Sequence, residues 1–243
     1  MIRRGVLAAL IVLAVSSSVR AHPEPPEGFE SALIGLLEMP LIDDLQDPSR
    51  PKRPTPERLD VRERPSASAR IVATIDRHGL TTRDGARCPW RGENPCLFHE
   101  SDYEESALAV FEKRVIAGRA WYRVAIDRGG RRFGWLESAA HFHTMRSLIA
   151  SSERLTYLTP AWLRTLYPWA GATVVRPAKP SRDFRIEQPY RPLQWSTVGG
   201  VLWVEVELLE GTCLGEETVI DRGWVPVRNP FGRLNAWYSS RGC

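Results

Sequence analysis

The sequence lacks the motifs by which many hydrolases and metalloenzymes are recognised. It contains no Gly-x-Ser-x-Gly nucleophile elbow and no His-Glu-x-x-His metal motif. None of its four cysteines stands in a pattern that pairs a nucleophilic thiol with a histidine. We therefore expect a protein that is not an enzyme and that carries no cofactor and no metal.

Long apolar runs are missing beyond the N-terminus. Residues 5–15 form an apolar run behind a basic start, and the small residues Val19 and Ala21 precede a cleavage point. Residues 1–21 are therefore typical of a secretory signal peptide, with a retained anchor as the alternative. No later segment approaches 18 apolar residues, so we expect a periplasmic or secreted protein with no membrane span after cleavage.

The chain also lacks a concentration of positive charge. Its net charge is +4, and removal of Arg3, Arg4 and Arg20 with the signal peptide leaves +1. Nucleic-acid binders usually present a strongly basic face, so nucleic acid is not an expected partner.

Two stretches of the chain have the pattern of the same β-hairpin. Residues 121–138 and 202–227 each carry a tryptophan at their first or second position, alternate apolar and polar residues, and return on Gly-Trp-aliphatic. This indicates an all-β protein with two tandem small β-barrels, at residues 57–145 and 146–243. Residues 22–56 are then an acidic, proline-rich extension and linker. One continuous sheet is the alternative.

Alternation assigns the strand faces of both hairpins. Trp121 and Trp203 occupy equivalent positions, as do Trp135 and Trp224, and we expect Trp121 and Trp203 to face outward. The residues expected to point into the two cores are Tyr122, Val124, Ile126, Val204, Val206 and Leu208. Residues 155–162 and 172–177 are further expected strands.

Residues 31–45 form an apolar segment within the extension. It is expected as a short helix broken at Pro40 or as an edge strand. Such a segment would pack on the chain itself or dock onto a partner.

Cysteine use in an exported chain indicates disulfides. Four cysteines allow three pairings, and we favour Cys88–Cys96 and Cys213–Cys243 because each pair then lies within one module. A zinc site is the alternative, but the spacing between Cys88 and Cys96 exceeds that of a zinc knuckle.

The first module resembles the bacterial Src-homology-3-like (SH3-like) family. The matching residues are Leu59, Val61, Arg62, Pro65, Ser66, Trp121, Tyr122, Val124, Gly134 and Trp135. In the second module they are Trp203, Val204, Val206, Gly223, Trp224 and Val225. The resemblance implies small five-stranded barrels that bind or target components of the cell envelope.

The function expected from these features is binding of an envelope component, a peptide or peptidoglycan. Aromatic side chains that face solvent can stack on sugars or hold an extended peptide. The expected contact residues are Trp121, Tyr122 and Trp203, with Trp90 as an outlying one. The alternative is a structural or assembly protein that docks a partner, an envelope protein, through residues 31–45.

Three histidines are candidate metal ligands. His141 and His143 are two residues apart and would share one face of a strand, as metal ligands can. His22 would become the N-terminal residue after cleavage, where its amine and imidazole could hold copper. Without a further ligand in the sequence, solvent exposure is the simpler expectation for all three.

Overall fold

The computed structural model describes residues 32–39, 58–76, 78–89, 98–102, 105–127, 130–150, 154–179, 187–210 and 217–239. The expected signal peptide, His22, Trp90, Cys96, Cys213 and Cys243 lie outside these residues. Regular structure in the described part is almost entirely antiparallel β-strand, so the all-β class is confirmed. No described helix is long and apolar enough to cross a membrane.

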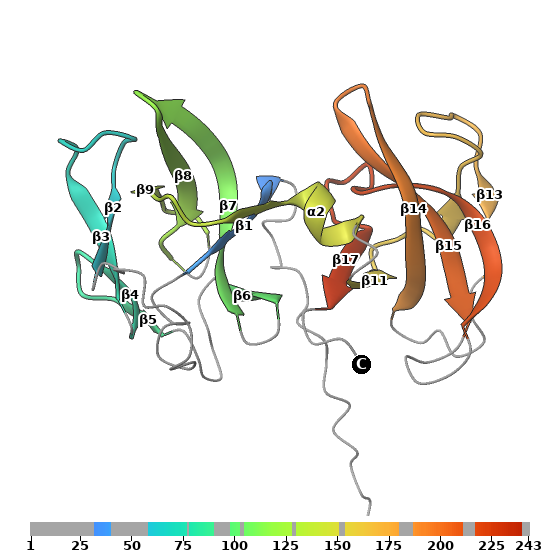
Figure 1. Cartoon of the computed structure of the whole chain (residues 1–243), viewed down its shortest axis with the longest axis horizontal. Helices are drawn as coiled ribbons and strands as arrows, with labels where there is room; N and C mark the ends of the chain where they lie inside the picture. Colours follow the sequence, from blue (N-terminus) through green and yellow to red (C-terminus); the bar gives the residue numbers. More distant parts are fainter. Residues whose placement is uncertain are drawn as a thin grey trace, which may run out of the picture.

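The first sheet has ten strands in the order β10-β1-β7-β8-β9-β2-β3-β4-β5, with β6 paired to β7 beside this path (Figure 1). Its strands are β1 (Gly35–Glu38), β2 (Arg58–Arg62), β3 (Ile71–Asp76), β4 (Gly79–Thr82), β5 (Arg87–Pro89), β6 (Phe98–Asp102), β7 (Glu105–Ile116), β8 (Arg119–Ala125), β9 (Phe133–Glu137) and β10 (Phe142–Thr144).

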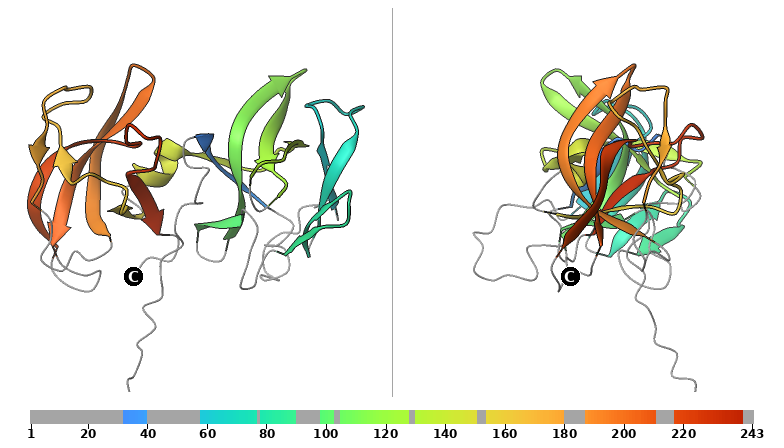
Figure 2. Two further views of the ribbon diagram at one scale, coloured as in Figure 1. Left: turned by 180° about the vertical axis from the view of Figure 1, so that it is seen from behind. Right: turned by 90° about the vertical axis from the view of Figure 1, so that its right-hand side faces the viewer.

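The second sheet has five strands in the order β16-β15-β14-β11-β17. Its strands are β11 (Leu155–Leu158), β14 (Gln188–Val198), β15 (Val201–Glu210), β16 (Thr218–Pro226) and β17 (Ala236–Ser239). A small hairpin of β12 (Thr165–Leu166) and β13 (Arg176–Pro177) joins it through a bridge between Tyr167 and Trp224 on β16. Helix α2 (Met145–Ile149) lies between the two sheets (Figures 1 and 2).

The two halves of the chain repeat one strand arrangement. In chain order, β1, β2, β3, β7, β8, β9 and β10 correspond to β11, β12, β13, β14, β15, β16 and β17. The spatial order β10-β1-β7-β8-β9-β2-β3 has its counterpart in β17-β11-β14-β15-β16, continued by β12 and β13. Strands β4 to β6 are an insertion between β3 and β7. The repeated unit begins with β1, inside the stretch that we expected to be an extension.

The repeat extends to the register of individual residues. Trp135 lies opposite Arg123, two residues beyond Trp121, and Trp224 lies opposite Glu205, two residues beyond Trp203. The strand before each of these hairpins also carries an irregularity at the same place, between Val110 and Glu112 on β7 and between Pro192 and Gln194 on β14. The expected equivalence of the two hairpins is therefore visible in the pairing.

Tight turns fix this register. The β7–β8 turn has Ala117 and Gly118 at φ 49° and 76°, and the β14–β15 turn has Gly199 and Gly200 at φ 59° and 78°. Two central residues with positive φ are the geometry of a two-residue turn that matches the twist of the paired strands.

A glycine contact recurs in both units. A Cβ at Gly134 would lie 2.4 Å from Val61 Cγ1, and one at Gly223 would lie 2.9 Å from Leu166 Cβ. In the first unit, β2 therefore packs directly against the backbone of β9. In the second unit, β12 packs in the same way against the backbone of β16. Neither sheet closes into a barrel within the described residues.

Two clusters of buried apolar residues form the cores of the described part of the chain. One lies within the first unit and contains the expected inward residues Tyr122, Val124 and Ile126. The other contains Val204, Val206 and Leu208 of the second unit, and it continues through α2 to Leu36, Ala109 and Phe111 of the first unit. Alternation thus predicted the inward faces, and the second core also joins the two units.

The described part of the apolar segment, residues 32–39, contains an inner strand in place of the expected short helix or edge strand. β1 pairs with β10 on one side and with β7 on the other. Leu33, Leu36 and Leu37 are at most 1% exposed. The described part of this segment is therefore packed within the chain.

Candidate functional site

Trp121 was expected to face solvent, but it is buried, with 3% of its surface exposed. It does point away from the core of the first unit, as alternation requires. On that face Arg114 of β7 and Glu137 of β9 lie directly opposite it. Long charged side chains cover flat apolar surface with their aliphatic stems, and the Arg114 guanidinium stacks 4.9 Å from the Trp135 ring on the same face.

Trp203 was also expected outward and is 8% exposed. It lies on the outer face of the second sheet, but the segment that follows β12 crosses that face. The Tyr167 ring covers it edge-on, with ring centroids 5.0 Å apart. The Trp203 indole N–H is buried and has no hydrogen-bond partner within the described residues.

Tyr122, the third expected contact residue, belongs to the core of the first unit. It is 3% exposed, and its ring lies 5.4 Å from that of Phe142. Alternation correctly placed Tyr122 on the inward face of β8. A ring on that face cannot contact a ligand in solution.

Trp90, the fourth, lies outside the described residues, as do three of the four cysteines. Cys88 is buried on β5 and has no free thiol. Its predicted partner is not among the described residues, so both pairings stay predictions.

Apolar side chains are exposed instead at the tip of the second unit. We call the set of Trp169, Val174, Val198 and Val201 the hairpin surface. These side chains are 61%, 67%, 41% and 41% exposed. Val198 and Val201 face each other across the β14–β15 turn, on the same face as Trp203. The segment carrying Trp169 and Val174 reaches this tip, because a Cβ at Gly171 would lie 2.7 Å from Val198 Cγ1.

The sequence did not reveal this surface. Residues 172–177 were expected to form a strand, but only Arg176 and Pro177 do so. Their partner β12 is two residues long, and no described strand pairs with Val174. Pro168 and Gly171 could have indicated an irregular segment here, since both favour a turn.

An ion pair fastens this segment to the sheet. Arg176 donates to both carboxylate oxygens of Asp221 on β16, at 2.9 and 2.6 Å, and the backbone N–H of Lys179 donates to the same carboxylate at 2.8 Å. The Arg176 hydrogen bonds lower the pKa of Asp221 from 3.8 to about 2, and the backbone donors add to this effect. The segment is therefore held at a defined place.

Among the described residues, no strand covers the edge of β14 beside the hairpin surface. β11 pairs only with residues 188–190 of β14, and within the described residues β15 alone pairs with 191–198. The pair that closes a two-residue hairpin is hydrogen-bonded, and neighbouring residues alternate. The backbone groups of Trp195 and Thr197 therefore point away from β15, toward the open side. The ring of Trp195 is 42% exposed and carries the Arg146 guanidinium 3.4 Å from its centroid.

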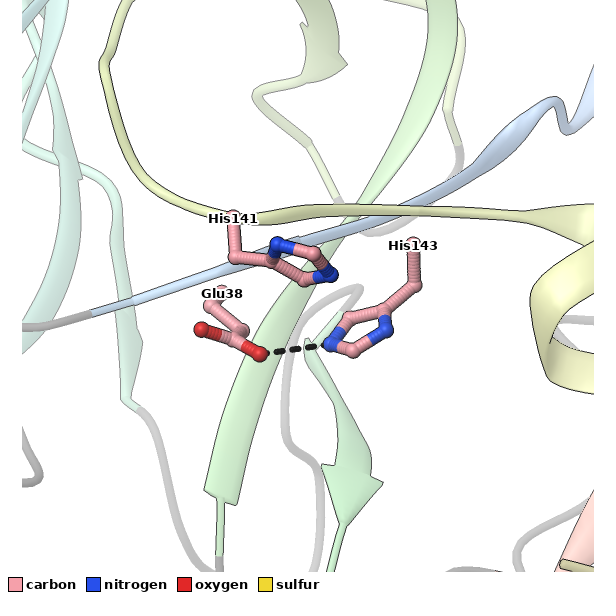
Figure 3. Close-up of side chains that lie close together, drawn as sticks. All are labelled: Glu38, His141 and His143. Atoms are coloured by element: carbon pink, nitrogen blue, oxygen red, sulfur yellow. Dashed lines mark hydrogen bonds and ion pairs between the residues drawn. The ribbon is translucent and has the colours of Figure 1, made fainter. Parts of the chain in front are cut away.

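A second group of chemically capable side chains lies in the first unit (Figure 3). Its members are Glu38, His141 and His143, whose potential metal-binding atoms all lie within 4.8 Å of one another. His143 Nε2 lies 2.6 Å from Glu38 Oε1, and the two imidazole rings meet edge to face with centroids 4.4 Å apart. His141 is exposed, and the other two are half-buried. We call this set the Glu-His-His cluster.

A small cleft at the other end of the first sheet is a weaker candidate. It is lined by Leu80, Arg87, Ile126 and Arg132, among others, and has a volume of about 150 Å³. Sites for organic ligands usually exceed about 300 Å³, so this cleft is too small for such a ligand.

Comparison of the chain with protein-family models, with curated proteins and with solved structures found no match.

Proposed function

We propose that this chain is an exported, non-catalytic envelope protein made of two SH3-like units, and that the second unit binds an extended peptide along β14. The observation that carries the proposal is the hairpin surface, an exposed apolar group next to an open strand edge. Soluble proteins seldom leave such groups uncovered unless they bind something there.

The chemistry of the site favours a peptide. An added strand would hydrogen-bond to the backbone groups of Trp195 and Thr197, as in other cases of strand addition. Its side chains would alternate between two faces. On one face they would meet Val198 and the segment of Trp169, and on the other they would meet the Trp195 ring.

Edge strands are often protected from such pairing. Arg191 and Pro192 protect the first part of the open edge in this way, since proline lacks a backbone donor and arginine brings charge. Residues 195–198 have neither feature, and they are the part next to the hairpin surface. The protection therefore ends where the proposed site begins.

The same chemistry has two sources in an envelope, a segment of an envelope protein and the stem peptides of peptidoglycan. The test uses the chain from residue 22 to 243 with its disulfides intact. One arm measures co-sedimentation with purified peptidoglycan sacculi. The other incorporates a photocrosslinking amino acid at Val198 and examines crosslinks to envelope proteins.

Both arms have matched variants. We expect Trp169→Ala to reduce capture, whereas Phe231→Ala removes an 80% exposed ring elsewhere and should not. Saturable sedimentation assigns the stem peptides, and a discrete crosslink from position 198 assigns a protein. Equal capture of Trp169→Ala and Phe231→Ala, both in sedimentation and in crosslinking from position 198, would refute the site.

A further inference from the structure

The positions of the Glu-His-His cluster follow from the strand pairing. His143 lies on β10 and His141 immediately precedes that strand, so the two side chains, two residues apart, project from one face. Leu36 pairs with His143, and the Glu38 backbone N–H donates to the His141 carbonyl at 3.0 Å. Glu38 therefore lies opposite His141 on that same face.

The backbone beside the cluster is fixed by strand pairing, and its neighbours on β7 are small. β1 is hydrogen-bonded on both sides, which fixes the backbone of Glu38. On the β7 side its neighbour is Ala107, and the neighbour of Leu36 is Ala109. Both are fully buried and small. The two β7 residues that pair with Leu36 and Glu38 therefore carry only methyl side chains.

The equivalent positions of the second unit show which side chains are compatible with this strand arrangement. By the register of the repeat, Glu38, His141 and His143 correspond to Tyr157, Trp237 and Ser239. Those three residues are 4%, 2% and 3% exposed, and Tyr157 and Trp237 belong to the apolar core. The same strands therefore form with packed aromatic residues, and the ionisable set is particular to the first unit.

A hydrogen bond between Glu38 and His143 explains two of the three residues. It gives no role to His141, whose exposed ring is held against that of His143. A metal ion accounts for all three. Two imidazoles and one carboxylate are a ligand set that zinc takes when it keeps a fourth position open.

The spacing of the ligand atoms suits such an ion. Ligands about 2.1 Å from a tetrahedral ion lie about 3.4 Å from one another. The corresponding atoms of Glu38, His141 and His143 all lie within 4.8 Å of one another. We propose that Glu38, His141 and His143 bind one divalent transition-metal ion of the zinc class, with a fourth position open to water or to another ligand atom.

The test is titration of the oxidised chain, residues 22–243, with Zn²⁺ by calorimetry after dialysis against a chelator. Co²⁺ provides a second readout, because its visible absorption reports coordination by nitrogen and oxygen. We expect one ion per chain and a rise in melting temperature on binding, since the ion links β1 to β10.

Four variants make the test specific. His141→Ala and Glu38→Gln should each weaken binding by about tenfold or more, because each removes a ligand. His141 is exposed and Gln keeps the size of Glu38, so neither change should unfold the apoprotein, which circular dichroism checks. His78→Ala removes a histidine from the turn between β3 and β4 and should change neither the affinity for Zn²⁺ nor the stoichiometry. His22→Ala removes the N-terminal chelating group and should leave the Zn²⁺ stoichiometry at one.

Two outcomes overturn the proposal. One is Zn²⁺ affinity that is the same in the parent chain, His141→Ala and Glu38→Gln, which would assign any bound ion to another place. The other is stoichiometry that falls to zero in His22→Ala alone. The proposal does not depend on peptide binding by the second unit, so either can fail without the other.

Discussion

Replacing Asp221 by Asn should release the segment that carries Trp169. The Asp221 carboxylate accepts two hydrogen bonds from Arg176, one from the Lys179 backbone N–H and one from its neighbour's backbone N–H at Arg222. It fixes the C-terminal end of this segment to β16, whereas the bridge between Tyr167 and Trp224 holds the other end. Asn keeps the size of the side chain but removes the charge and one acceptor oxygen.

The expected loss of stability follows from the pKa. A pKa of about 2 in place of 3.8 corresponds to at most about 2.5 kcal/mol, at about 1.36 kcal/mol for each tenfold change in proton affinity. The Asp221 side chain is 9% exposed but that of Arg176 is 49% exposed, so solvent screens the pair. We therefore expect Asp221→Asn to lower the free energy of unfolding by about 1–2 kcal/mol at pH 7.

The pH dependence has a defined sign. The pKa of Asp221 is lower in the folded chain than in the unfolded one, so its contribution is complete above about pH 4. It is lost as the pH falls through about 2. The difference between the parent chain and the variant should therefore shrink on acidification, with about half of it left at pH 3.

Urea unfolding followed by tryptophan fluorescence at pH 7 and pH 3 measures this difference. Glu217→Gln is the matched control, since Glu217 pairs with Arg191 but both side chains are more than 40% exposed. It should leave the urea midpoint unchanged. A difference for Asp221→Asn that is the same at both pH values would refute the electrostatic reasoning, and no difference at pH 7 would refute the anchoring role.

Three further predictions concern packing and exposure. Gly134→Ala should destabilise the chain by about 1–3 kcal/mol in urea unfolding, because the added Cβ would lie 2.4 Å from Val61 Cγ1; an unchanged midpoint would contradict the close approach of β2 and β9. Tyr190→Phe removes the hydroxyl that donates to the Ile149 carbonyl at 2.7 Å, and should cost about 1–3 kcal/mol by the same assay. Because burial raises the pKa of Tyr190, the parent chain should also lose stability above about pH 10, and Tyr190→Phe should lose less; equal alkaline profiles would show that the hydroxyl is accessible. Trp169→Ala should leave the melting temperature unchanged, since this ring is 61% exposed; a large drop would mean that the ring is packed and unavailable to a ligand.

For the expected contact residues, the sequence predicted the strand face but not the exposure to solvent. Alternation placed Trp121 and Trp203 on the faces opposite the cores, and the structure agrees. Exposure does not follow from the face alone. Arg114 and Glu137 flank one ring, and Tyr167 covers the other. These neighbours come from other strands or from a crossing segment, so the pattern of one strand contains no sign of them.

The Glu-His-His cluster was only partly recognisable from the sequence. His141 and His143 could be recognised as a pair because a strand repeats its direction every two residues. Glu38 is 105 residues from His143 in the chain, inside a segment that the sequence placed apart from the first unit. Only the insertion of β1 between β10 and β7 brings the carboxylate to the histidines.

By itself the sequence determined the all-β class, the two equivalent hairpins and the residues that face each core. These features depend on two-residue alternation and on turns, which act over a few neighbouring residues. The tertiary structure alone decided which outward rings are covered, which apolar side chains stay exposed at Val198 and Trp169, and which side chains meet across strands. These depend on contacts between segments far apart in the chain, where no local pattern records the partner.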